Sequence, residues 1–290
     1  MQYYKEPITA EQLTDFISRA LYEDVRDGDH SALACIPADR RDKAVLKVKQ
    51  DGVLAGVEVA KAVFAHLDAS ATVNVFQQDG ARIRNGDSCL EVVCNTRALL
   101  QAERLVLNTM QRMSGIATAS RRYADAIADL PVQLLDTRKT TPLLRFLEKY
   151  AVSVGGATNY RYGLYDRIML KDNHIDAAGG VAEAIRRTVN YLRESGKNLE
   201  ITVEIRNLTE LQTALDSGVQ VQLMLDNFDV NTLRKAVELV DKRLPTEASG
   251  GITFETLRDY ASTGVDYISV GALTHSAGCL DLSLKVVKEA

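Results

Sequence analysis

Residues 201–271 show most clearly how this chain is built; they read ITVEIRNLTELQTALDSGVQVQLMLDNFDVNTLRKAVELVDKRLPTEASGGITFETLRDYASTGVDYISVG. Short apolar runs recur in this segment, and each ends in a polar residue or a glycine, at Glu204, Asp226, Ser249 and Gly271. These landmarks are 22, 23 and 22 residues apart, about the length of one strand followed by one helix. The pattern predicts parallel strands connected by helices.

The same alternation begins near residue 130. We expect strands at 132–136, 167–171, 201–205, 221–226, 245–249 and 267–271, and helices at 180–195, 209–217, 230–243 and 254–262. Thr209 and Thr253 stand where N-cap hydroxyls are expected. All strands of a parallel α/β barrel end at one mouth, where catalytic groups gather, so the polar strand ends favour a barrel. An open doubly wound sheet is the alternative, but no GxGxxG follows a strand.

The first 130 residues have a different pattern. A helix is expected at about 10–22, and polar and apolar residues alternate as in strands at 43–49, 72–78 and 88–95. A long helix should follow, from about Arg97 to Asp129. The full length of 290 residues suits one large domain or a large and a small one.

Composition excludes several classes of function. The formal net charge of −4 argues against general nucleic-acid binding, which needs a broad basic face. Nowhere do 18 apolar residues follow one another, so we expect no membrane span. The N-terminus has no basic segment followed by an apolar core, so we expect no secretory signal.

The cysteines Cys35, Cys89, Cys94 and Cys279 form no CxxC pair. We expect them to be reduced, buried thiols in a cytoplasmic protein. Cys89 and Cys94 are five residues apart in an expected strand, so they should point to opposite faces of its sheet.

Residues 136–174 form a basic segment, with seven Lys and Arg residues against four acidic ones. Apolar runs and glycines interrupt the charges, which indicates a pocket for a multiply charged anion rather than a solvated charge block. Arg138, Lys139, Arg161 and Lys171 stand at strand ends or beside glycines and could neutralise about three or four negative charges. Arginine suits carboxylates, and lysine serves as a point charge for phosphate.

Carboxylates and glycine loops complete the candidate site. Glu204 and Asp226 end adjacent expected strands and could bind Mg²⁺, through water and a substrate phosphate, or the hydroxyls of a sugar. A salt bridge of these acids with Lys171 is the structural alternative. The loops SGGI (249–252) and SVGALTHS (269–276) lie one strand–helix unit apart, as phosphate-binding loops of barrels do.

Other motifs of enzymes are absent from the sequence. The histidines His30, His66, His174 and His275 lack metal-ligand spacing, so we expect no zinc site. His174 is expected to order its loop, and His275 to donate to a phosphate. No GxSxG, HExxH or GxxxxGK[ST] occurs.

A set of ordered motifs resembles the quinolinate phosphoribosyltransferase family, also called nicotinate-nucleotide pyrophosphorylase (carboxylating). The motifs cover nearly the whole chain and are EDVRDGDHS, DGVLAGVEVA, ERLVLN, DTRKTTP, GLYDRIMLKDNHI, VEI, LDN, EASGGI and GVDYISVGALTHS. The resemblance implies the type II phosphoribosyltransferase fold. That fold has a small N-terminal α/β sandwich domain, here 1–115 with 276–290 packing on it, and an incomplete parallel α/β (TIM-like) barrel, here 116–275.

The resemblance also implies residue roles. The family forms homodimers in which each site is completed by the partner subunit, and Arg104 resembles the arginine donated across the interface. Arg138, Lys139 and Lys171, with Glu204 and Asp226, resemble the catalytic residues, and the two acids also the Mg²⁺ ligands. The implied substrate contacts are Arg104, Thr137, Arg138, Lys139, Tyr160, Arg161, Lys171, Glu204, Asp226, Ser249, Gly250, Gly251, Val270, Gly271, Ala272 and His275.

The chain departs from the family at one motif. Where the family usually reads GGGxNHR, this chain reads GGATNYR, with Ala157 and Tyr160 in place of glycine and histidine. Tyrosine can donate a hydrogen bond, but it cannot carry positive charge at neutral pH.

The implied reaction joins quinolinate to phosphoribosyl pyrophosphate and gives nicotinate mononucleotide, pyrophosphate and CO₂ in the de novo synthesis of NAD. Two alternatives stay open. One is a paralogous phosphoribosyltransferase of the kind associated with molybdate-transport operons, acting on another base. The other is a non-catalytic anion-binding protein, although anion capture gains nothing from carboxylates such as Glu204 and Asp226.

Overall fold

The computed structural model describes residues 7–287, which fall into two compact units. The barrel unit comprises residues 122–140 and 157–275. The sandwich unit comprises 7–121, 141–156 and 276–287, so it contains the described part of the C-terminal segment. None of the helices within residues 7–287 is long and apolar enough to cross a membrane.

The sandwich unit is built on an antiparallel sheet in the order β12-β1-β5-β3. Its strands are β1 (Arg41–Val48), β3 (Thr72–Val75), β5 (Ser88–Asn95) and β12 (Leu282–Val287), and β2 (Gly52–Val53) pairs separately with β4 (Arg82–Ile83). The helices are α1 (Ala10–Asp24), α2 (His30–Cys35), α3 (Val57–Leu67), α4 (Thr96–Ala126), whose last residues count in the barrel unit, and α5 (Arg145–Val154).

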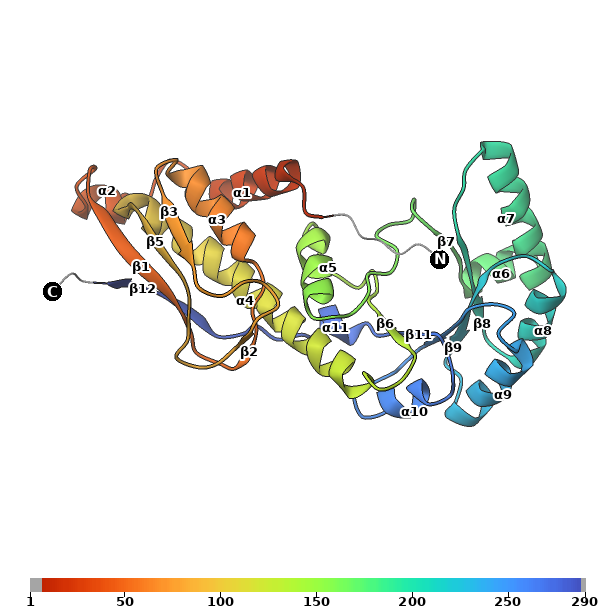
Figure 1. Cartoon of the computed structure of the whole chain (residues 1–290). Coiled ribbons are helices and arrows are strands. Elements are labelled where there is room, and N and C mark those ends of the chain that lie inside the picture. The colour runs from red at the N-terminus through yellow and green to blue at the C-terminus, as the bar shows by residue number, and fades with distance from the viewer. Residues whose placement is uncertain (1–6, 288–290) are drawn as a thin grey trace. The chain divides into compact units, whose positions relative to one another are not determined.

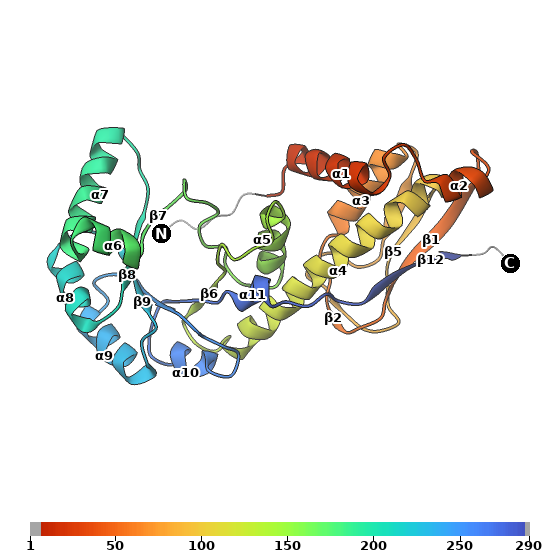
Figure 2. The same ribbon diagram turned by 180° about the vertical axis from the view of Figure 1, so that it is seen from behind.

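Alternation along the strands creates the core of the sandwich unit. Leu46 in β1, Val92 in β5 and Leu282 in β12 are buried on one face of the sheet. They pack in a single apolar cluster with side chains of α1, α3 and α4. The ribbons of these helices lie beside the sheet (Figures 1 and 2). One face of the sheet is thereby covered by helices, which accounts for the two-layer α/β arrangement.

The expectations for the cysteines were wrong in two respects. Cys89 is the extra residue of a β-bulge, because Leu46 pairs with Leu90 while Lys47 pairs with Ser88. The bulge shifts the alternation by one residue, so Cys89 and Cys94 are buried in the same cluster rather than on opposite faces. Cys35 and Cys279 are exposed, and all four thiols are free.

The barrel unit contains six parallel strands in the order β6-β11-β10-β9-β8-β7. They are β6 (Gln133–Leu135), β7 (Ile168–Leu170), β8 (Ile201–Ile205), β9 (Gln222–Asp226), β10 (Thr246–Ser249) and β11 (Tyr267–Ser269). Consecutive strands are neighbours except for β6 and β7, which form the two edges. At the open edge, Thr158 makes an isolated parallel bridge to Leu135. The incomplete α/β barrel predicted from the sequence is confirmed.

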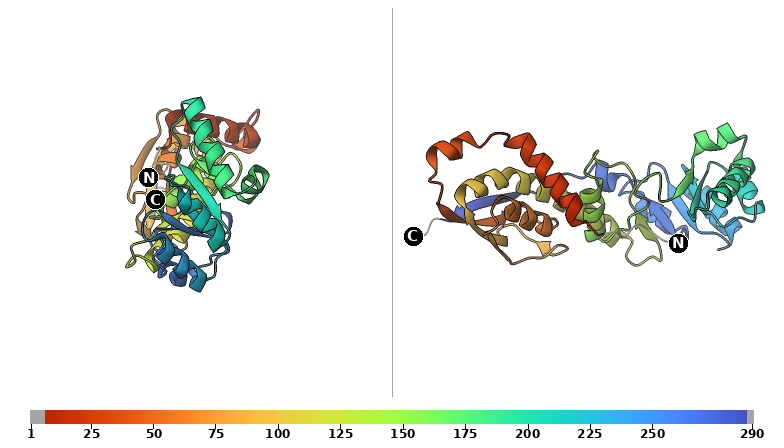
Figure 3. Two further views of the ribbon diagram at one scale, coloured as in Figure 1. Left: turned by 90° about the vertical axis from the view of Figure 1, so that its right-hand side faces the viewer. Right: turned by 90° about the horizontal axis from the view of Figure 1, so that it is seen from above.

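Helices cover the outer side of this sheet (Figures 1 and 3). They are α6 (Asp172–Ala178), α7 (Val181–Ser195), α8 (Leu208–Asp216), α9 (Val230–Val240) and α10 (Leu257–Ala261), while the short α11 (Ala272–His275) follows the end of β11. The two N-cap predictions were wrong. Asn207 caps α8, because its side chain accepts from the Glu210 N–H and asparagine is the stronger cap. The helix α10 starts four residues after Thr253, with Thr256 at the N-cap position.

Candidate active site at the barrel mouth

The mouth of the barrel is lined by residues that follow the carboxyl ends of the strands. Lys139 lies after β6, Lys171 directly follows β7, and Gly271 lies after β11. Glu204 is the penultimate residue of β8, and Asp226 is the last residue of β9. Because the strands are parallel, these side chains gather at the same end of the sheet, as the sequence predicts.

Two arginines form the most unusual feature of the mouth. Arg161 is only 8% exposed, and its pKa is lowered first by burial and then by the charge of Arg138. Its guanidinium donates a hydrogen bond to the carbonyl of Arg167 (3.3 Å). The Nε of Arg138 is buried and has no hydrogen-bond partner among residues 7–287. Two neighbouring cations, one with a buried donor to spare, suit a ligand that carries two carboxylates.

The loops after β6 and β11 are tied together. The Thr274 hydroxyl donates to the carbonyl of Lys139 (2.8 Å), and the Thr137 hydroxyl accepts from the Lys139 N–H (3.1 Å). A Cβ on Gly271 would lie 2.9 Å from Cδ of Lys139 and 3.0 Å from Nε2 of His275. Gly271 therefore leaves the space that these two basic side chains occupy.

Glycines also shape the loop after β10. Gly250 and Gly251 both have positive φ, at +93° and +62°. A Cβ on Gly250 would lie 2.3 Å from Oδ1 of Asn227, whose own N–H donates to the Ser249 carbonyl (2.9 Å). The conformation and the close approach both require glycine here.

These loops present backbone donors. Within residues 7–287, no hydrogen bond uses the N–H groups of Gly250, Gly251 and Ile252 or those of Gly271, Ala272 and Leu273. Successive N–H groups without an internal acceptor are suited to bind a phosphate. The two glycine loops of the sequence prediction therefore have a backbone arrangement that suits a phosphate. Val270 directly precedes the second of these loops.

The two acids at the mouth lie near one another. Glu204 is 7% exposed, and its pKa is raised, first by burial and further by the charge of Asp226. The Asp172 N–H donates to Oε1 of Glu204 (3.2 Å) and opposes that rise. The Nζ of Lys171 lies 3.8 Å from Oε2 of Glu204, so the ion pair considered in the sequence analysis is present. The Lys171 side chain is 50% exposed, which makes this pair weak.

A divalent cation fits these acids only if the substrate supplies further ligands. Among residues 7–287, no three His, Cys, Asp or Glu side chains gather in the manner of a protein-only metal site. Mg²⁺ commonly uses one or two carboxylates together with water and phosphate oxygens. Nearby, the Lys171 N–H donates to Nδ1 of His174 (3.0 Å), so His174 orders this loop as expected.

A buried polar network inside the barrel was not foreseen from the sequence. Tyr160 is 3% exposed, and its hydroxyl lies 2.9 Å from Oγ1 of Thr202 and 3.2 Å from Nε2 of Gln222. The same Gln222 nitrogen donates to Oε2 of Glu247 (2.5 Å). The Arg167 guanidinium donates to Thr202 (3.1 Å) and to Oε1 of Gln222 (3.2 Å). One feature of the sequence could have predicted this network. Two or four residues before the polar strand ends stand further polar residues, namely Thr202, Gln222 and Glu247. Because side chains alternate along a strand, these residues lie on the same face of the sheet as the strand-end residues.

Arg104 lies outside the barrel unit, on α4 in the sandwich unit. Its side chain is 63% exposed and lies 3.5 Å from Glu103. Its expected role depends on a second subunit and stays a prediction.

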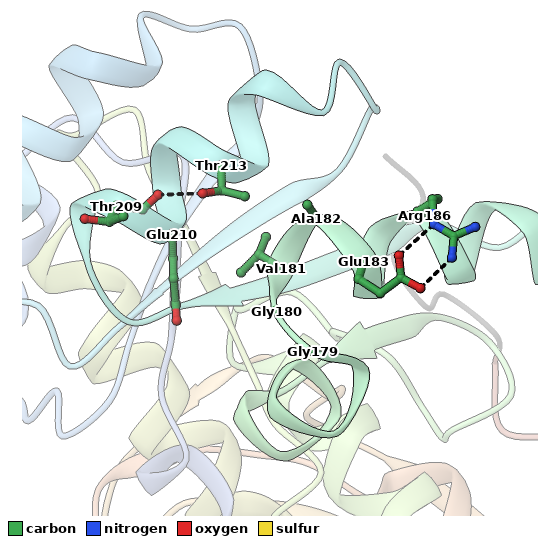
Figure 4. A pocket seen from close by; sticks show the side chains of 9 residues that line it. All are labelled: Gly179, Gly180, Val181, Ala182, Glu183, Arg186, Thr209, Glu210 and Thr213. Atoms are coloured by element: carbon green, nitrogen blue, oxygen red, sulfur yellow. Dashed lines mark hydrogen bonds and ion pairs between the residues drawn. The ribbon is translucent and has the colours of Figure 1, made fainter.

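A separate pocket opens between the first turns of α7 and α8 (Figure 4). Its charged residues are already paired: Glu183 accepts hydrogen bonds from Arg186 and Arg187, and Glu210 accepts from Arg206. None of the residues predicted for the active site lines this pocket.

Comparisons with known proteins agree over nearly the whole chain. Family models for the N-terminal and C-terminal domains of quinolinate phosphoribosyl transferase match residues 29–114 and 116–285. The chain is 42% identical over 292 residues to the mitochondrial quinolinate phosphoribosyltransferase [decarboxylating] 2b of Nicotiana tabacum, covering 96% of this chain and 83% of that protein. It is 40% identical over 275 residues to the probable nicotinate-nucleotide pyrophosphorylase [carboxylating] of Bacillus subtilis, covering 95% of this chain and 93% of that protein. The crystal structure of NadC from Streptococcus pyogenes is similar with a TM-score of 0.91 and 39% identity, covering 98% of this chain and 100% of that one.

Proposed function

Because this chain belongs to the quinolinate phosphoribosyltransferase family, we propose that it transfers the phosphoribosyl group of phosphoribosyl pyrophosphate to quinolinate, with decarboxylation. The products are nicotinate mononucleotide, pyrophosphate and CO₂, as in the de novo synthesis of NAD. The observation that carries the proposal is the buried Arg161 beside Arg138, whose Nε has no hydrogen-bond partner among residues 7–287. This pair matches the two adjacent carboxylates of quinolinate.

Each region of the mouth has a role in this reaction. Arg138 and Arg161 bind the carboxylates of quinolinate, and Tyr160 directly precedes Arg161 in the chain. Lys139, Lys171 and His275 face the pyrophosphate and phosphate groups. The loops Ser249–Gly251 and Val270–Ala272, with Thr137, hold the 5-phosphate. In both glycine loops, the N–H groups that make no hydrogen bond within the described part of the chain support this division.

The chemistry needs no covalent bond to the protein. The pyridine nitrogen of quinolinate attacks the anomeric carbon of the ribose while the bond to pyrophosphate breaks. The nitrogen becomes cationic and stabilises the electron pair left on the neighbouring ring carbon when its carboxylate departs as CO₂. That carbon then takes up a proton. Glu204 and Asp226 offset the positive charge that develops on the ribose, and such preorganised charges supply a large share of catalysis.

Glu204 and Asp226 would also hold Mg²⁺, and the neighbouring negative charge that raises the pKa of Glu204 supports a cation there. When bound, the ion would supply positive charge opposite the pyrophosphate oxygens. The protein itself contributes Lys139 and Lys171 to the same task.

The proposal includes a homodimer in which Arg104 of one subunit completes the site of the other. The side chain of Arg104 is 63% exposed and, among residues 7–287, its ion-pair partner is its neighbour Glu103. This exposure supports a role in contacting a ligand outside its own unit. It also includes a cytoplasmic location, which the four free thiols support.

The test compares substrates. Purified protein is assayed with phosphoribosyl pyrophosphate and Mg²⁺ against quinolinate and nicotinate separately, with binding of phosphoribosyl pyrophosphate measured in parallel. We expect turnover with quinolinate only. Turnover with nicotinate or another base would favour the paralogous transferase, and binding without turnover would favour an anion-binding protein. The comparisons favour the first outcome.

A further inference from the structure

Tyr160 departs from the family motif and is held inside the barrel. Its ring belongs to a small buried cluster with Leu135, Met169 and Met224. Its hydroxyl is hydrogen-bonded to Thr202 and Gln222. These two residues lie near the N-terminal ends of β8 and β9, whereas Glu204 and Asp226 lie at the carboxyl ends of the same strands. A hydroxyl satisfied in this way has little capacity to bind a substrate at the mouth.

Arg161, the next residue in the chain, needs a fixed neighbour to hold its position. Arg161 lies beside Arg138, and like charges repel, so its position must be fixed by the chain on either side. On one side, the Tyr160 N–H donates to Oδ1 of Asp136 (2.7 Å). On the other, the N–H groups of Tyr162 and Gly163 donate to Asp166 (2.6 and 2.9 Å). The Tyr160 side chain adds the attachment that reaches deepest into the barrel.

We propose that Tyr160 is a positioning residue: its hydroxyl, held by Thr202 and Gln222, fixes Arg161 next to Arg138 and does not itself contact the substrate. The network continues from Gln222 to the fully buried Glu247 and to Arg167. The Arg167 carbonyl in turn accepts the hydrogen bond of the Arg161 guanidinium. The buried polar side chains thus hold both ends of the segment from Tyr160 to Arg167.

The inference rests on the proposed function only in taking a dicarboxylate as the ligand of Arg138 and Arg161. It can therefore be tested by binding alone, with phthalate as a non-reacting dicarboxylate and isothermal titration calorimetry as the assay. Tyr160→Phe removes the hydroxyl, and Thr202→Val removes its partner inside the barrel without touching the mouth. Both variants should weaken phthalate binding about 3- to 10-fold, the value of one hydrogen bond. The double variant should bind no more weakly than the weaker single one.

Matched controls separate positioning from general destabilisation. Thr246→Val makes the same change in the same sheet, but Thr246 binds Asp266 and not Tyr160. This variant should leave the affinity for phthalate unchanged even if its melting temperature falls. Thr202→Ser keeps the hydroxyl and should bind phthalate like the unchanged protein. Thr202→Ala also removes the hydroxyl and takes the place of Thr202→Val if that variant does not fold.

Three results would overturn the proposal. The first is Tyr160→Phe weakening binding while Thr202→Val does not, since the hydroxyl would then contact the ligand directly. The second is a double variant in which the losses of phthalate affinity caused by the two single changes multiply. The third is no phthalate binding by the unchanged protein. Phthalate binding without quinolinate turnover would count against the proposed function and leave the positioning role standing.

Discussion

Glu247 gives the sharpest physical test of the barrel interior. The residue is fully buried in β10, and burial raises the pKa of its carboxyl from 4.5 to about 7. Hydrogen bonds from Ser269, Tyr160 and Gln222 and the charge of Arg167 lower the pKa but do not cancel the effect of burial. Arg167 is also paired with Glu200, which limits how far its charge lowers the pKa of Glu247.

The sign of the pH effect follows from this pKa. The unfolded chain ionises Glu247 near pH 4.5, whereas the folded protein keeps its proton up to about pH 7. Between these values the folded state binds more protons, so the free energy of unfolding falls as the pH rises and levels off above about pH 7. A difference of about 2.5 in pKa corresponds to roughly 3 kcal/mol. The Glu247→Gln variant is neutral at every pH and lacks this loss.

Urea denaturation of the wild type and of Glu247→Gln between pH 4.5 and 8 measures the effect. The stability of the variant relative to wild type should rise by roughly 3 kcal/mol across this range, most of it before pH 7. Glu238→Gln, on the exposed side of α9, is the matched control and should change the free energy of unfolding by no more than about 0.5 kcal/mol. A constant difference between wild type and Glu247→Gln at every pH would refute the raised pKa.

Three further predictions concern the mouth. Arg138→Ala should lower kcat/KM for quinolinate about 100-fold or more with an unchanged circular dichroism spectrum, because a charged donor pair is lost; near-normal kinetics would contradict its role. Gly250→Ala should raise KM for phosphoribosyl pyrophosphate, because its Cβ would clash with Asn227, while Gly218→Ala, also at positive φ but in open space, should not. Asp226→Asn should raise the Mg²⁺ concentration needed for phosphoribosyl pyrophosphate binding at least about 10-fold; unchanged titrations would exclude this ligand.

The sequence predicted the parts of the fold that depend on periodicity. The spacing of Glu204, Asp226, Ser249 and Gly271 identified consecutive strand–helix units, because the length of such a unit is set by strand and helix geometry. The strand ends then placed these residues at one mouth.

Features that depend on tertiary contacts escaped prediction. The bulge at Cys89 changes which face its side chain takes, and no local pattern marks it. The direction of the Tyr160 side chain is decided by Thr202 and Gln222, which are distant in sequence. The N-cap of α8 is Asn207, two residues before the predicted Thr209. A difference of this size lies within the ordinary uncertainty of helix ends.

The most direct test of the proposed reaction is release of CO₂ from carboxyl-labelled quinolinate. The purified protein is incubated with phosphoribosyl pyrophosphate and Mg²⁺, and CO₂ and pyrophosphate are measured together. We predict equal amounts of both, with neither released when quinolinate or phosphoribosyl pyrophosphate is omitted. A folded protein that releases neither product, or pyrophosphate without CO₂, would contradict the assignment.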